Sequence, residues 1–134
     1  MSRYSDSSRA LQTTADGSCS AKIVNRAAVE RVRARLASDV RVGRTVAIFS
    51  AAADPTRLRI LDALSAEELC VCDLAEVCGI SQSGISHQLR LLRDRGLVAF
   101  RRDGNRAVYR LADDHVRMLL AIGLEHADEA GEGA

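Results

Sequence analysis

The chain has 134 residues, a formal net charge of +1 and 47% hydrophobic residues, which indicates one folded domain of ordinary size. No apolar run approaches the roughly 20 residues of a membrane span, and the Ser/Thr-rich start lacks the apolar stretch of a secretory signal, so we expect a cytoplasmic protein. In that compartment the four cysteines are expected to be reduced thiols or metal ligands rather than disulfides.

The first half of the chain predicts a short arm followed by helices. Residues 1–20 have the composition of a disordered arm, and residues 21–130 are expected to form a single folded domain. Helical spacing of apolar residues predicts helices near 24–38 and 41–52. Asp54-Pro55, an N-cap acid before a proline at the first helical position, predicts a further helix that ends near Ser65.

The segment 69–95 predicts a helix-turn-helix. A short helix over 69–78 is followed by a turn in which Gly79 takes the left-handed cap and Ser81 the next N-cap. The second helix, over 82–95, places Ile85, Leu89 and Leu92 on its inner stripe and polar residues outside. Two short helices joined by a glycine-containing turn are typical of this motif.

A β-hairpin is predicted directly after the second helix. Residues 97–102 and 106–111 have strand patterns, and Asp103-Gly104-Asn105 between them carries the Asp-Gly hairpin signal. The predicted fold of residues 21–130 is therefore mainly α with a β-hairpin wing, a winged helix-turn-helix that we expect to bind DNA. The ligand spacing described below predicts that this domain also dimerises, as a homodimer.

The charge pattern indicates a polyanionic partner for one segment and cations for the next. Residues 90–110 carry a net charge of +5, from seven Arg and two Asp, whereas residues 111–134 carry −5, from six acids and one Arg. We expect double-stranded operator DNA to bind the exposed helix face and the wing. The candidate DNA-binding residues are Gln82, Ser83, Ser86, His87, Gln88, Arg90, Arg101, Arg102 and Arg106. An ordinary solvated helix face remains an alternative for each of them.

Cys70 and Cys72 lie two residues apart at the predicted start of a helix, where the helix dipole and free N–H groups favour thiolates. Two thiolates do not close a metal site, so a third donor must come from elsewhere. Cys19 on the arm is the candidate, and Asp73 could add an oxygen. Sulfur ligands favour soft ions such as Cd(II) or Pb(II) over magnesium or calcium.

A second candidate metal site lies on the C-terminal segment 113–129, which predicts one amphipathic helix. His115 and His126 fall on nearly the same helix face but roughly 16 Å apart along the axis. Their pairs, Asp113 with His115 and His126 with Glu129, can therefore meet only between two antiparallel copies of the helix. The spacing predicts a dimer with two inter-subunit sites of two nitrogens and two oxygens, suited to Zn(II). Plain solvated surface is the alternative.

These motifs together resemble the ArsR/SmtB family of metal-sensing repressors. The resemblance covers about residues 54–129 and rests on Glu68-Leu69-Cys70-Val71-Cys72-Asp73-Leu74-Ala75, on Ser86-His87-Gln88-Leu89, on the hairpin and on the C-terminal Asp-x-His and His-x-x-Glu. It is nearest to the CadC-type cadmium, lead and zinc sensors. It implies an apo-dimer that represses metal efflux or sequestration genes and leaves its operator on binding metal. It also suggests a hydrogen bond from the non-ligating nitrogen of His126 toward the recognition helix near His87.

The sequence departs from that pattern in ways that leave alternatives open. CadC-like sensors bring two N-terminal cysteines to the Cys-x-Cys pair, whereas this chain offers only Cys19. Arsenic sensors of the family often carry a third cysteine where this chain has Ala75, so an arsenite-responsive repressor is an alternative. A thiol redox sensor on the same scaffold is another. We interpret Cys78 as a small core residue, and we do not expect an enzyme, because the three histidines have no evident nucleophile partner and no Gly-rich phosphate loop is present.

Overall fold

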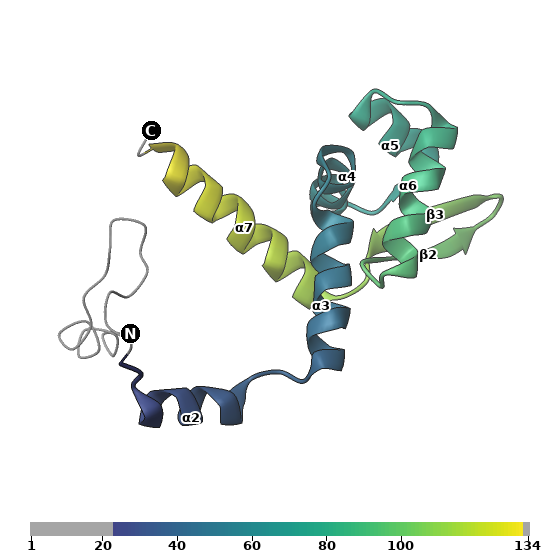
Figure 1. Cartoon of the computed structure of the whole chain (residues 1–134). Coiled ribbons are helices and arrows are strands. Elements are labelled where there is room, and N and C mark those ends of the chain that lie inside the picture. Colours follow the sequence, from purple (N-terminus) through teal and green to yellow (C-terminus); the bar gives the residue numbers. More distant parts are fainter. Residues whose placement is uncertain (1–22, 133–134) are drawn as a thin grey trace. The chain divides into compact units, whose positions relative to one another are not determined.

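A computed structural model describes residues 23–132 of the chain (Figure 1). The predicted arm over residues 1–20, with Cys19, lies outside the described residues. The described residues divide into two units, the first ending at Asp39 and the second beginning at Val40, and each is described by itself.

The first unit contains helix α2 (Arg26–Arg35). Asn25 caps its start, because the side-chain oxygen accepts a hydrogen bond from the Ala28 N–H at 3.0 Å. The predicted helix over 24–38 is therefore confirmed in its middle and shorter at both ends. Val32 and Leu36 are exposed apolar residues of this segment.

The second unit contains helix α3 (Asp39–Ala52), except for its first residue, and helix α4 (Pro55–Ala66). Asp54 is the N-cap of α4, and its carboxylate accepts from the Arg57 N–H at 3.0 Å, while Pro55 occupies the first turn as predicted. The Arg57 side chain donates to the carbonyl oxygens of Ser50 and Ala51, at 3.5 and 2.6 Å, and so joins the start of α4 to the end of α3.

The helix-turn-helix consists of α5 (Val71–Cys78) and α6 (Gln82–Asp94). Gly79 ends α5 with φ +68°, a left-handed conformation that side-chain-bearing residues rarely adopt. Ser81 then caps α6 by accepting from the Gly84 N–H at 3.0 Å. Both predictions for the turn are confirmed.

In the described part of the chain, three antiparallel strands form one sheet in the order β1-β3-β2. These are β1 (Leu69–Cys70), β2 (Val98–Asp103) and β3 (Arg106–Leu111). The prediction of a helix over the whole of 69–78 was wrong at its start, because Leu69 pairs with Tyr109 and Cys70 with Val108 of the wing. That pairing satisfies the backbone of Leu69 and Cys70 as strand, and the helix begins only at Val71.

The wing is the hairpin of β2 and β3, whose register pairs Asp103 with Arg106. Asp103 is therefore the last residue of a strand rather than part of the loop, and the connection is the two residues Gly104 and Asn105. Gly104 has φ +63°, the positive value that a two-residue hairpin with glycine in its first position requires.

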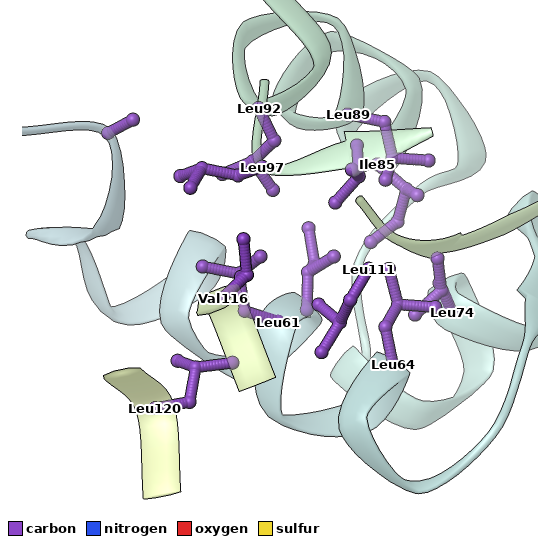
Figure 2. Close-up of a cluster of buried hydrophobic side chains, with 13 residues drawn as sticks. Leu61, Leu64, Leu74, Ile85, Leu89, Leu92, Leu97, Leu111, Val116 and Leu120 are labelled. Atoms are coloured by element: carbon purple, nitrogen blue, oxygen red, sulfur yellow. The ribbon is translucent and has the colours of Figure 1, made fainter. Parts of the chain in front are cut away.

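The hydrophobic core is aliphatic and draws on every element from the end of α3 to α7 (Figure 2). Its most deeply buried members in α4, α5 and α6 are Ile60, Leu61, Leu64, Leu74, Ile85, Leu89 and Leu92. The three residues from α6 are the predicted inner stripe. Full burial of each such side chain contributes roughly 1.5–3 kcal/mol, so this stripe holds α6 firmly with its polar face outward.

The C-terminal helix is α7 (Asp114–Glu132). Asp113 precedes it, and its carboxylate accepts from the Val116 N–H at 3.1 Å, which is N-cap geometry. Val116 and Leu120 reach the core, whereas residues 121–131 are all exposed. In the part of the chain that the structure describes, no helix is both long and apolar enough to span a bilayer.

Candidate nucleic-acid interface and metal centres

The outer face of α6 presents the predicted DNA-contacting side chains to solvent. Most of them are exposed, namely Gln82, Ser83, Ser86, His87 and Arg90. Gln88 is half-buried instead, and its side-chain oxygen accepts from Arg57 Nη1 at 3.1 Å. Gln88 therefore joins α6 to α4, a contact that sequence reasoning missed because its partner lies 31 residues away.

Two of the three predicted wing arginines contact side chains on or beside the hairpin. Arg101 forms an ion pair with Glu68, with Nη2 and Oε1 at 3.1 Å. The guanidinium carbon of Arg102 lies 5.9 Å from the centre of the Phe100 ring, and that of Arg93, from α6, lies 5.1 Å from it. Both arginines are exposed, so their guanidinium groups combine this contact with access to solvent.

The third wing arginine, Arg106, contacts the predicted thiol site. Its Nη2 donates to Cys70 Sγ at 2.9 Å and lies 3.6 Å from Asp73 Oδ2. These two partners raise the pKa of Arg106, the hydrogen bond to Cys70 being the largest cause. Sequence reasoning placed Arg106 only on the wing, and its link to the thiol follows from the pairing of β1 with β3.

Cys70 and Asp73 meet at the start of α5. The Asp73 carboxylate accepts from the Cys70 thiol at 3.0 Å and from the Cys70 N–H at 3.1 Å. The thiol and backbone hydrogen bonds of Cys70, followed by the charge of Arg106, lower the pKa of Asp73. Cys70 is only 5% exposed, whereas Cys72 is exposed.

This donor set fits a soft metal ion only in part. The sulfur of Cys70 lies beside a carboxylate oxygen of Asp73 and beside the positively charged side chain of Arg106. Cys72 is two residues from Cys70 along the chain. Within residues 23–132, however, no group of three or more His, Cys, Asp or Glu side chains is gathered to hold a metal. The predicted third sulfur donor, Cys19, lies outside those residues.

Cys78 lies apart from these residues at the end of α5. It is half-buried and packs against the core, in agreement with its interpretation as a small core residue. Burial raises the pKa of its thiol. A thiol with a raised pKa is less often ionised and is a poor ligand near neutral pH.

The C-terminal candidates lie on the exposed side of α7. Asp113 and His115 are neighbours, with Oδ1 and Nδ1 at 3.8 Å, and the His115 side chain is 92% exposed. His126 and Glu129 are also exposed. The helix separates the two pairs along its axis, so within one chain they do not form one site.

The same face of α7 also carries exposed apolar side chains. At 100° per residue, Leu119 and Ile122 fall within about 40° of the direction of His115. They are 39% and 63% exposed. Helix α7 therefore has one face in the core, through Val116 and Leu120, and a second face that combines apolar residues with potential metal ligands.

Comparison with known proteins places these elements in a family of transcriptional regulators. The family model described as "Bacterial regulatory protein, arsR family" matches residues 54–99, from the cap of α4 into β2. A transcriptional repressor SmtB homolog of Synechocystis sp. is 42% identical over 112 residues, which are 84% of this chain and 85% of that protein. A cadmium resistance transcriptional regulatory protein CadC homolog of Staphylococcus aureus is 41% identical over 61% of this chain and 69% of its own length.

A solved structure supports the same assignment. The homodimeric winged helix-turn-helix DNA-binding domain of a possible ArsR-family regulator from Mycobacterium bovis superposes with a TM-score of 0.69 and 33% identity, over 75% of this chain and 95% of that one. The chain belongs to the ArsR/SmtB family, and the predicted winged helix-turn-helix fold is confirmed. It is a transcriptional regulator rather than an enzyme.

Proposed function

We propose that the protein is a cytoplasmic, metal-responsive repressor that binds operator DNA as a metal-free dimer. Binding of Cd(II), Pb(II) or Zn(II) releases it and allows expression of genes for metal efflux or sequestration. The observation that carries this proposal is the meeting of Cys70 and Asp73 with a wing arginine at the start of the helix-turn-helix. The CadC homolog, whose name states cadmium resistance, supports the choice of a soft metal.

The DNA surface in this proposal is the outer face of α6 together with the wing. Ser83, Ser86 and His87 are short, exposed polar side chains on a helix whose opposite stripe is buried, which suits entry into a major groove. Arg101 and Arg102 supply phosphate contacts from the hairpin. Two copies related by a two-fold axis would present two such helices about one helical turn of DNA apart.

The dimer in this proposal forms along α7. Exposed Leu119 and Ile122 give the apolar surface that two antiparallel copies would bury, and the ligand pairs stand at either end of it. Asp113 and His115 of one copy would then face His126 and Glu129 of the other, forming two Zn(II) sites. Metal at these sites would fix the angle between protomers, and a bond from His126 toward His87 would carry that change to α6.

The soft-metal site would use Cys70, Cys72 and Asp73, with Cys19 as the third sulfur. Helix α5 starts at Val71, so Cys70 is its cap and lies outside the regular helix. This matters because the side chains of residues i and i+2 inside a helix point about 200° apart, whereas a cap residue is free of that constraint.

The test uses fluorescence anisotropy to measure release of the protein from operator DNA, with Cd(II), Pb(II), Zn(II) and arsenite added one at a time. Cys70→Ser is expected to lose release by cadmium and lead and to keep DNA binding. His126→Ala, at the other site, should keep release by cadmium and lose any release by zinc. If cadmium releases Cys70→Ser from DNA as it releases the wild type, the thiol site is not the sensor. If arsenite alone releases the wild type, the inducer is arsenite rather than the proposed metals.

A further inference from the structure

Arg106 occupies the position of a cation at the thiol site. Its Nη2 lies 2.9 Å from Cys70 Sγ and 3.6 Å from Asp73 Oδ2, the two donors that the structure brings together there. A guanidinium satisfies both groups in the metal-free protein, because it donates to the sulfur and is attracted to the carboxylate. A divalent ion bound by the same two atoms would compete with it for them.

The sheet connects this cation to the wing. Cys70 pairs with Val108 of β3, and Arg106 lies two residues before Val108, on the same face of the sheet. Arg106 is also the first residue of β3 and pairs with Asp103 across the two-residue loop. Its contact with Cys70 and Asp73 therefore fixes the end of the hairpin against the start of α5.

Arg101 provides an internal comparison. It lies on the neighbouring strand, is similarly exposed, and forms its ion pair with Glu68 rather than with the thiol. Both arginines hold the wing to the segment 68–73, and both add positive charge to the hairpin. Only Arg106 touches the atoms that would bind a metal ion.

We propose that a metal ion must displace the guanidinium of Arg106 from Cys70 and Asp73. We propose further that this displacement is how metal binding at the thiol site loosens the wing. The inference rests on the proposed function and adds how metal binding at its thiol site affects the wing. A divalent ion at the sulfur repels the guanidinium, so the end of the hairpin loses its anchor. A wing with a fixed position loses less freedom on binding DNA than a released one, and metal therefore weakens operator binding.

The experiment compares Arg106→Gln with Arg101→Gln, which removes the same charge from the same hairpin. Cadmium affinity is measured by competition with a chelator, followed by the sulfur-to-cadmium absorption band. Operator affinity is measured by anisotropy with and without cadmium. Arg106→Gln should bind cadmium about two- to fivefold more tightly, the range for a pair this exposed. Arg101→Gln should bind it as the wild type does.

The operator measurements separate the two roles of Arg106. Both variants should bind the operator more weakly without metal, because each loses a basic side chain. Only Arg106→Gln should also lose less operator affinity on addition of cadmium than the wild type does. Arg106→Lys, which keeps the charge but loses the planar guanidinium, should fall between wild type and Arg106→Gln, and it carries the test if the glutamine variant does not fold.

Equal cadmium affinities and equal release ratios in Arg106→Gln and Arg101→Gln would overturn the inference while leaving the thiol sensor intact. A wild type that cadmium does not release from its operator would contradict the proposed function itself. The two failures are distinguishable, because cadmium affinity is measured in the absence of DNA.

Discussion

The apolar face of α7 makes a quantitative prediction about self-association. Ile122 is 63% exposed in the single chain, and burial of a whole isoleucine side chain contributes roughly 1.5–3 kcal/mol. If the dimer covers the exposed part, each copy gains about 1–2 kcal/mol from this residue, and the dimer about 2–4 kcal/mol. Ile122→Ala should therefore raise the dissociation constant of the dimer by roughly 30- to several-hundred-fold.

Sedimentation equilibrium over a range of protein concentrations measures this constant. Val77→Ala is the matched control, because Val77 is an apolar residue of α5 with 64% exposure and no place in the proposed interface. The control should dimerise as the wild type does. If both variants dissociate alike, or if Ile122→Ala dimerises like the wild type, two copies do not associate along this face of α7.

Four further predictions concern the fold and the thiols. Ser81→Ala should lower the free energy of unfolding in urea by about 1 kcal/mol, because the Gly84 N–H loses its side-chain acceptor, and Ser86→Ala on the exposed face should leave it nearly unchanged. Leu89→Ala should cost about 2–5 kcal/mol in the same assay, and a loss below 1 kcal/mol would contradict the packing of α6 described above. Cys72 should react with iodoacetamide at neutral pH faster than Cys78, as followed by peptide mass spectrometry, because burial raises the pKa of the Cys78 thiol; equal rates would refute this. For the same reason the folded state holds the Cys78 proton more tightly than the unfolded chain, so stability should fall more steeply in the wild type than in Cys78→Ala as the pH rises above about 8.5.

Most of the fold could be predicted because its signals are local. Asp54-Pro55 starts α4, Gly79 and Ser81 form the turn, and the spacing of apolar residues in α6 defines its buried stripe. Each of these depends on backbone geometry or periodicity within a few residues. Sequence could also name the candidate ligands on α7, because the spacing of His115 and His126 along one helix follows from helix geometry alone.

What the sequence alone could not provide are contacts between residues far apart in the chain. Leu69 and Cys70 look like the start of a helix, yet they form a strand because β3, almost 40 residues later, supplies hydrogen-bonding partners. The same pairing brings Arg106 to Cys70, a separation of 36 residues.

The sequence by itself determined the family of folds and the helix-turn-helix, because propensity, capping and periodicity act locally, and it named the candidate metal ligands. Only the tertiary structure decided that the thiol of Cys70 belongs to the wing's sheet and that a wing arginine is its neighbour. Strand pairing and ion contacts depend on which surfaces meet after the core has formed, and no local pattern in residues 68–73 or 101–106 encodes that meeting.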